Sequence, residues 1–89
     1  MRKIQIKVIN VLGIHARPSA KIAQLASRFS CSVWLVVKGR RANARSIVAV
    51  MLLAAAVGST ITIETSGADE REAIEALTDL IGRGFAANP

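Results

Sequence analysis

Acidic residues are absent from the first 63 positions of this 89-residue chain. All six Asp and Glu lie from Glu64 onward, whereas ten of the twelve Lys and Arg precede that residue. The net charge is +6, and this uneven distribution predicts attraction to an acidic protein surface, to phosphate or to nucleic acid, without choosing among them. The only histidine, His15, has no nearby acid in sequence that could orient it as in a catalytic triad.

Cysteine and long apolar segments are also scarce. The single cysteine, Cys31, excludes an intramolecular disulfide and is typical of a reducing compartment. One His and one Cys cannot supply several such ligands, so we expect no metal site. The longest apolar run, Ile47 to Val57, is too short to cross a bilayer, and the N-terminus lacks the apolar segment of a signal peptide. We therefore expect a cytoplasmic protein without membrane insertion.

Hydrophobic residues make up 52% of the sequence, which predicts one folded domain spanning residues 1–89. Alternating apolar and polar residues predict four strands, at 3–8, 33–37, 41–44 and 60–65. The strand at 3–8 turns Ile4, Ile6 and Val8 to its buried face.

Helical spacing and capping residues predict three helices, from His15 to about Phe29, from Ser46 to Gly58, and onward from Asp69. Asp69 and Glu72 resemble a capping box, and Ala73, Ile74, Leu77, Leu80 and Ile81 form the buried stripe of the last helix. The order β-α-β-β-α-β-α predicts an α+β open-faced sandwich, a four-stranded antiparallel sheet with three helices on one face. The other face of the sheet is expected to expose Lys3, Gln5, Lys7, Trp34 and Thr62.

The segment Gly13-Ile14-His15-Ala16-Arg17-Pro18 holds the most informative motif. Proline belongs in the first turn of a helix, because the N–H that it lacks has no partner there. His15 is therefore expected at a helix N-terminus, beside the free amides of Ala16 and Arg17, which with the helix dipole and the Arg17 guanidinium form an anion site. An imidazole at a phosphate site predicts a phosphorylated histidine. The ordinary alternative is a cap or a partly buried polar residue.

The helix predicted after Ser46 is apolar on all sides. A helix of this kind is usually buried all round, which here requires cover from the other two helices. In a small two-layer domain, the alternative is that it exposes several of Ile47, Val48, Met51 and Leu52, and such a patch marks a protein docking surface.

The motif at His15, the Ser46 segment and the order of elements together resemble the HPr/NPr family, the histidine phosphocarriers of the bacterial phosphotransferase system. The resemblance extends over residues 2 to 85. It implies a carrier, not an enzyme, in which His15 accepts phosphate on Nδ1 from enzyme I and passes it to the A components of sugar permeases. Arg17 and the Ala16 amide would bind the phosphate. The family also implies a monomer without a cofactor, and Ser46 as the target of an HPr kinase/phosphorylase.

The same resemblance assigns partner-docking residues: Ala16, Ala20 and Gln24 on the first helix, and Arg45, Ile47, Val48 and Met51 on the second. The chain departs from the family in being strongly basic, and its tail after Gly84 has no acidic side chain to balance Arg17.

Two other functions remain open. The run from Val50 to Leu53 and the Gly-x-Gly-Phe ending are also similar to NPr, the nitrogen-regulatory branch of the family. A basic nucleic-acid-binding module is the alternative of a different class, which the aromatic content of 3% disfavours because few rings could stack on bases.

Overall fold

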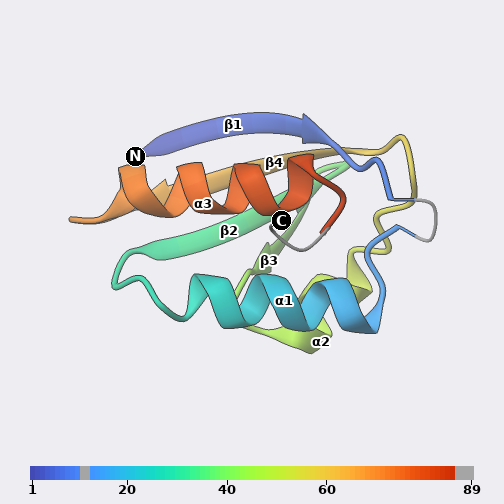
Figure 1. The fold of residues 1–89 in the computed structure, drawn as a ribbon, viewed down its shortest axis with the longest axis horizontal. Coiled ribbons are helices and arrows are strands. Elements are labelled where there is room, and N and C mark those ends of the chain that lie inside the picture. The colour runs from blue at the N-terminus through green and yellow to red at the C-terminus, as the bar shows by residue number, and fades with distance from the viewer. Residues whose placement is uncertain (11–12, 86–89) are drawn as a thin grey trace.

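The computed structural model describes residues 1–10 and 13–85 of the chain. Seven elements follow one another: β1 (Arg2–Lys7), α1 (Ala16–Ala26), β2 (Ser32–Val37), β3 (Arg40–Asn43), α2 (Ile47–Leu52), β4 (Thr60–Ser66) and α3 (Glu70–Gly82). The strands pair antiparallel in the order β1-β4-β2-β3. Helices α1 and α3 run across one face of the sheet, and α2 packs against α1 (Figure 1). The predicted open-faced α+β sandwich is confirmed.

Strand β2 shows how the alternation predicted from sequence sets the two faces of the sheet. Val33, Leu35 and Val37 are buried, whereas Trp34 and Val36 are only half-buried on the other face. The turn that follows places Lys38 and Gly39 at φ +51° and +78°, as a two-residue hairpin connection of type I′ requires. Strand β3 therefore begins at Arg40, one residue before the predicted start.

The core lies between the sheet and the helices. Its largest fully buried side chains come from every layer: Val8, Ile22, Val33, Leu35, Val50, Ile61, Ile63, Leu77 and Ile81. All five residues of the stripe predicted for α3 are buried, so that prediction is confirmed. On the opposite face of the sheet, none of the side chains expected to be exposed is buried.

Strand β1 departs from its predicted pattern. Val8 is buried just beyond the strand and Ile6 is half-buried, but Ile4 is 40% exposed. Because β1 is an edge strand, its side chains have a neighbouring strand on one side only.

Two helices are shorter than predicted. Helix α1 ends at Ala26 instead of near Phe29, and the hydroxyl of Ser27 donates to the carbonyl of Ala23 at 2.7 Å. Helix α2 ends at Leu52 and does not continue to Val57. Its continuation is broken because Ala54 has a left-handed φ of +51°, which turns the following residues away from the helix axis.

The predicted capping box of α3 is wrong. Asp69 is the N-cap residue, but its side chain makes no capping hydrogen bond. Its carboxylate instead accepts the amides of Ser30 at 2.9 Å and Cys31 at 2.8 Å, in the loop between α1 and β2. The donated amide of Ser30 contributes most to lowering the pKa of Asp69 to about 2. Asp69 therefore links the start of α3 to the loop between α1 and β2.

The hydrogen bonds of the Asp69 carboxylate predict that the stability of the fold depends on pH. The folded-state pKa of Asp69 lies below its usual value of 3.8, so the carboxylate stabilises the fold above about pH 4 and loses this effect as the pH falls toward 2. The variant Asp69→Asn is expected to unfold at lower urea concentration than wild type at pH 7, with the difference shrinking between pH 4 and 2. Trp34 fluorescence would follow unfolding. A difference that stays constant down to pH 2 would contradict the assignment.

Candidate functional site

His15 is the N-cap residue of α1, as the sequence predicts, and its side chain is exposed. The imidazole makes no capping hydrogen bond, while the backbone carbonyl of His15 accepts the amide of Ser19 at 2.9 Å. In the described part of the chain, no acceptor bonds to the amides of Ala16 or Arg17. The imidazole therefore lies beside two unused N–H donors at the positive end of a helix.

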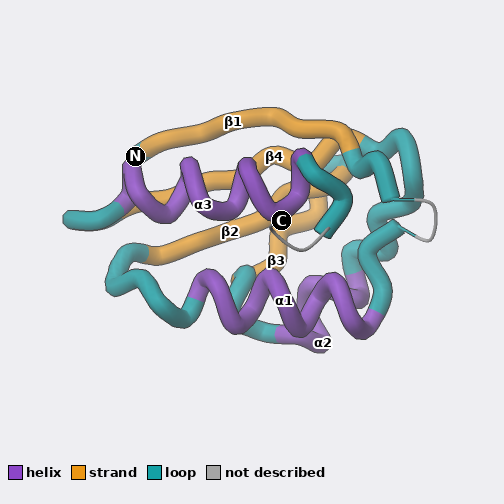
Figure 2. The backbone as a smooth tube through the Cα atoms, in the orientation of Figure 1, coloured by secondary structure: helices purple, strands orange, loops and turns teal. Residues whose placement is uncertain are grey.

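The loop that leads to His15 is fixed from two sides. Within the loop, the amide of Gly13 donates to the carbonyl of Asn10 at 3.0 Å, and the Asn10 side chain donates back to the carbonyl of Gly13. Across from it, the amide of buried Ile14 donates to the carbonyl of Ala55 at 2.8 Å. Ala55 belongs to the loop between α2 and β4, so two loops meet at one end of the molecule (Figure 2).

An open depression of about 700 Å³ surrounds the imidazole. It is lined by Asn10, His15, Ala16, Arg17, Pro18, Lys21, Gly84 and Phe85. Lys21 follows Arg17 by four residues on the same helix face, and its Nζ donates to the carbonyl of Phe85 at 3.1 Å. Lys21 was not predicted as a site residue, although its i, i+4 spacing from Arg17 is visible in the sequence. The end of α3 could not be placed there from local pattern.

The described lining of this depression contains cationic side chains and no carboxylate. The residues beyond Phe85, where the sequence predicts no acidic partner for Arg17, lie outside the described part of the chain. No group of His, Cys, Asp and Glu in residues 1–10 and 13–85 is arranged to hold a metal ion. In the same residues, no helix has both the length and the apolar character needed to span a bilayer.

Ser46 is the N-cap residue of α2, and its hydroxyl accepts the amide of Ala49 at 3.2 Å. The helix that it starts has a large exposed apolar surface, formed by Ile47 (42% exposed), Val48 (66%), Met51 (41%) and Leu52 (64%). Of the two interpretations of this helix, the exposed one is confirmed. On α1, Gln24 is exposed and Ala20 is half-buried. We call the surface made of Ala20, Gln24, Ile47, Val48, Met51 and Leu52 the α1–α2 face.

Arg45 has a structural role that the sequence did not indicate. Its Nη2 donates to the carbonyls of Phe29 and of Cys31, the second at 2.8 Å. The loop between α1 and β2 is thus held by Arg45 through its carbonyls and by Asp69 through its amides. Burial raises the pKa of the Cys31 thiol in this loop.

The exposed sheet face offers little to a nucleic acid. The guanidinium of Arg41 lies 4.0 Å from the centre of the Trp34 ring and covers it. Glu64 lies at the middle of the same face, 3.7 Å from Lys3 and 3.5 Å from Arg41. A single-stranded nucleic acid would have to displace Arg41 to stack on Trp34 and would meet the negative charge of Glu64.

Comparison with known proteins agrees with this geometry. A family model described as the PTS HPr component phosphorylation site matches residues 2–83. The phosphocarrier protein HPr of Neisseria meningitidis is 52% identical over 85 residues, 96% of each chain. The phosphocarrier protein HPr of Cupriavidus necator is 53% identical over 88% of each chain. The crystal structure of HPr from Thermoanaerobacter tengcongensis matches all of both chains with a TM-score of 0.93 and 38% identity.

These relatives are similar along almost the whole chain, and in fold as well as in sequence. They are named as carriers of a phosphoryl group and not as enzymes. The family match includes the segment that holds His15 at the start of α1. This chain belongs to the HPr family, the phosphocarriers of the phosphotransferase system.

Proposed function

We propose that this protein carries a phosphoryl group on His15, which accepts it from enzyme I and gives it to the A components of sugar permeases in the cytoplasm. The observation that supports this most is the exposed imidazole at the N-cap of α1, beside the unused amides of Ala16 and Arg17. Such an N-terminus attracts a negatively charged group. The relatives described above are named HPr, which favours this branch over NPr.

The proposed transfer needs a neutral imidazole, because the ring then has one nitrogen with a free lone pair. This nitrogen, Nδ1 by the family's pattern, attacks phosphorus, and a new N–P bond forms while the bond from phosphorus to the donor breaks. In this proposal the amides of Ala16 and Arg17 and the Arg17 guanidinium hold the phosphoryl oxygens during the transfer. In the onward transfer an acceptor group of the next protein attacks phosphorus, the N–P bond breaks, and its electron pair returns to the imidazole nitrogen, without a cofactor.

Incubation with labelled phosphoenolpyruvate and enzyme I tests the proposal directly. We expect one phosphoryl group per chain, labile to acid and stable to base. The HPr of Neisseria meningitidis provides a positive control for the donor. No labelling of this chain, with the control labelled, would contradict the proposed function.

The variant Arg17→Ala is expected to slow phosphoryl transfer by about 10²-fold, the order of effect seen when one stabilising donor is removed from a transition state. Arg17 is exposed and forms no ion pair with a described residue, so the melting temperature should fall by no more than a few degrees. Rapid-quench kinetics would measure the transfer, with Arg40→Ala on β3 as an exposed control. Normal kinetics with a large loss of stability would reverse the assignment.

We further propose that enzyme I and the permease components dock on the α1–α2 face, next to His15. Exposed apolar residues gathered on one surface are typical of a protein interaction site. Arg45, which the family resemblance assigns to this interface, bonds through its guanidinium to the loop after α1 and would contribute positive charge there. In the same proposal, an HPr kinase/phosphorylase regulates docking by modifying Ser46, and the carrier acts as a monomer.

The variant Ser46→Asp tests this regulation. A phosphate on Ser46 adds about −1.5 to −2 charges at pH 7. At a helix N-terminus this charge is favourable by about 0.3–1 kcal/mol, so the fold should tolerate it. The same charge lies beside Ile47, where an apolar contact would have to desolvate it. We therefore expect Ser46→Asp to stay folded and to accept phosphate from enzyme I more slowly than wild type.

The variant Ser46→Ala tests the loss of the helix cap without the negative charge of Ser46→Asp. It loses the bond to the Ala49 amide, at a cost of about 0.5–2 kcal/mol, but adds no charge and should accept phosphate at the wild-type rate. Equal acceptance rates for wild type and Ser46→Asp across a range of salt concentrations would leave Ser46 as a helix cap only.

A further inference from the structure

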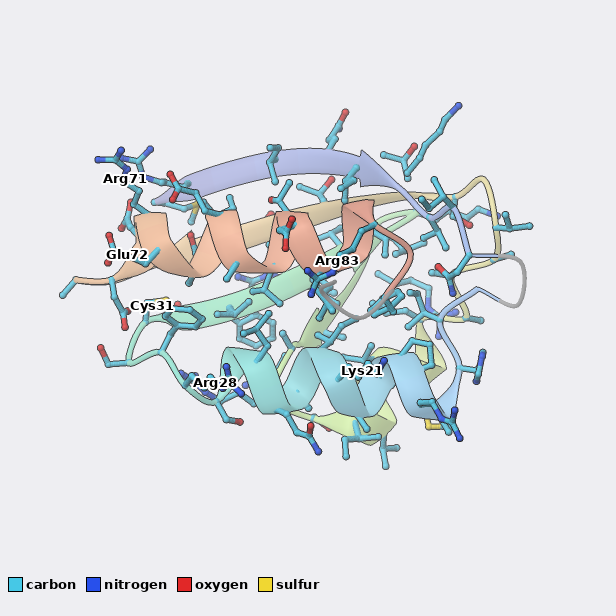
Figure 3. All side chains as sticks on the ribbon, viewed as in Figure 1. Lys21, Arg28, Cys31, Arg71, Glu72 and Arg83 are labelled. Atoms are coloured by element: carbon cyan, nitrogen blue, oxygen red, sulfur yellow. The ribbon has the colours of Figure 1, made fainter. Side chains whose placement is uncertain are left out.

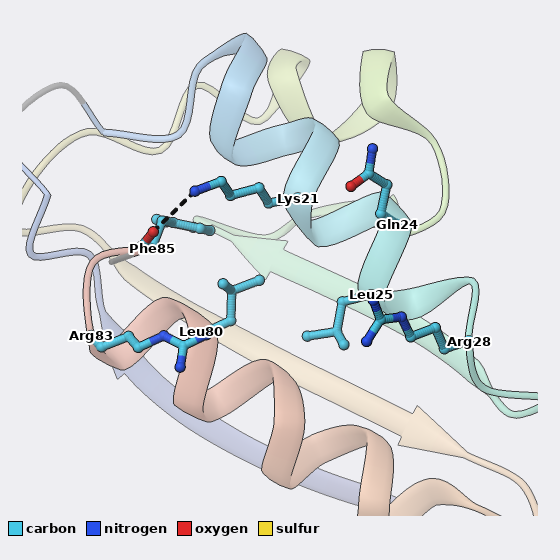
Figure 4. A pocket seen from close by; sticks show the side chains of 7 residues that line it. All are labelled: Lys21, Gln24, Leu25, Arg28, Leu80, Arg83 and Phe85. Atoms are coloured by element: carbon cyan, nitrogen blue, oxygen red, sulfur yellow. Dashed lines mark hydrogen bonds between the residues drawn. The ribbon is translucent and has the colours of Figure 1, made fainter. Parts of the chain in front are cut away.

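A second pocket, of about 250 Å³, lies between α1 and α3 (Figure 4). We call it the α1–α3 pocket. Its lining consists of Lys21, Gln24, Leu25, Arg28, Leu80, Arg83 and Phe85. Three of these residues, Lys21, Gln24 and Leu25, belong to α1, and Arg28 lies in the turn that follows this helix. The structure therefore brings one face of α1 against the end of α3 and leaves an opening between them.

The lining of this pocket combines apolar and cationic side chains. Leu25, Leu80 and Phe85 provide apolar surface, and Lys21, Arg28 and Arg83 provide three cations. Lys21 projects from α1, Arg28 from the turn after α1, and Arg83 from the end of α3 (Figure 3). None of the described lining residues is acidic. A ligand with a short apolar part and a concentrated negative charge fits this combination.

Lys21 and Arg28 retain N–H donors for such a ligand. Lys21 uses one of its three N–H donors on the carbonyl of Phe85. Arg83 bonds through Nη1 to Asp79 at 2.9 Å, so its charge is partly balanced. Arg28 is exposed and forms no ion pair with a described residue. Arg28 and Lys21 therefore supply most of the positive potential.

The volume limits the size of the ligand. At about 250 Å³ the pocket is slightly below the range of about 300–1,000 Å³ that is typical of ligand sites, so it suits one small organic molecule. A peptide helix or a nucleic acid strand does not fit into it. Guanidinium groups match phosphate oxygens with paired N–H donors, and a phosphate monoester concentrates close to two negative charges.

We propose that the α1–α3 pocket binds a small organic phosphate monoester, with its phosphate on Arg28 and its carbon chain against Leu25 and Leu80, which lie beside this guanidinium (Figure 4). This anion site is distinct from the one at the start of α1. The two share Lys21 and Phe85, which border both the α1–α3 pocket and the depression around His15. A ligand in the α1–α3 pocket would therefore lie next to residues that also border the His15 site.

An NMR titration of the full chain with n-butyl phosphate tests the site. We expect amide shifts centred on Gln24, Leu25 and Leu80, and binding at least fivefold tighter than that of inorganic phosphate or 1-butanol, each of which has only half of the recognised chemistry. In Arg28→Ala the affinity should fall at least fivefold. In the matched control Arg71→Ala, an exposed arginine on α3, it should change less than twofold.

Three results would overturn the proposal. The first is unchanged affinity in Arg28→Ala. The second is loss of affinity in Arg17→Ala alone, since this would place the phosphate at the start of α1. The third is at least fivefold tighter binding by a chain shortened after Phe85, because residues 86–89 would then be the occupant of the pocket. The backbone spectrum of each variant confirms that it is folded before its affinity is compared.

Discussion

The variant His15→Ala is expected to lose all phosphoryl acceptance from enzyme I. No other histidine exists in the chain, so no other imidazole can form the N–P bond. The fold should be almost unchanged, because the His15 side chain is exposed and makes no capping hydrogen bond. A surface substitution of this kind usually changes stability by less than about 0.5 kcal/mol. The measurement is acid-labile label from phosphoenolpyruvate.

Two controls show whether the loss of acceptance comes from the missing imidazole and not from unfolding or failed docking. Thermal unfolding shows whether His15→Ala is as stable as wild type. The variant should also compete with wild type for enzyme I, because the α1–α2 face is intact. Acid-labile label that persists in the folded variant would remove His15 from its proposed role.

The variant Gly13→Ala should have the largest effect on stability. Gly13 has a φ of +68°, which costs a residue with a side chain about 1–2 kcal/mol. In addition, a Cβ at this position would lie 2.5 Å from the carbonyl oxygen of Ala55 and 3.0 Å from the Cα of Ala56. Both are backbone atoms, so the two loops must separate. We expect a total loss of about 2–4 kcal/mol, or more than about 10 °C in Tm.

Gly58→Ala is the matched control for this prediction. Gly58 also has a positive φ, +85°, but a Cβ there meets nothing within 4 Å. The loss of stability in Gly58→Ala should therefore come from the positive φ alone. The difference in stability between the two variants then measures the clash of the new side chain at position 13 with Ala55. Gly13→Ala should also slow phosphoryl acceptance, since the displaced loop positions His15. Equal destabilisation by the two substitutions would show that the loops are not tightly packed.

The parts of the fold that could be predicted are those with a periodic signal. The apolar residues of strand β2 alternate and those of α3 recur every three to four residues, as the burial of each element requires, so both were predicted from sequence. The end of α2 was not, because Ala54 takes a left-handed φ that no local residue type indicates. The role of Asp69 was missed for another reason. Its carboxylate bonds to amides 38 and 39 residues away in sequence, and a capping rule considers only the adjacent turn.

The same division applies to the candidate site. His15, Arg17 and Ser46 lie at helix starts. Pro18 in the first turn and Ser46 as an N-cap are local signals of such starts, so these positions could be predicted from the sequence. The contact of Ile14 with Ala55 and the bond from Lys21 to Phe85 join segments distant in sequence. They depend on how the helices and loops assemble, which the pattern of a single sequence does not specify.

The order of the strands gives the basic charge of the chain a physical consequence. β1 and β3 are the two open edges of the sheet, and each carries a cation that forms no ion pair with a described residue, Lys7 on one edge and Arg40 on the other. A second copy that extended the sheet through either edge would bring like charges together. Charged edge strands are one way in which proteins avoid aggregation. This protection is electrostatic, so it weakens as added salt shortens the range of the repulsion.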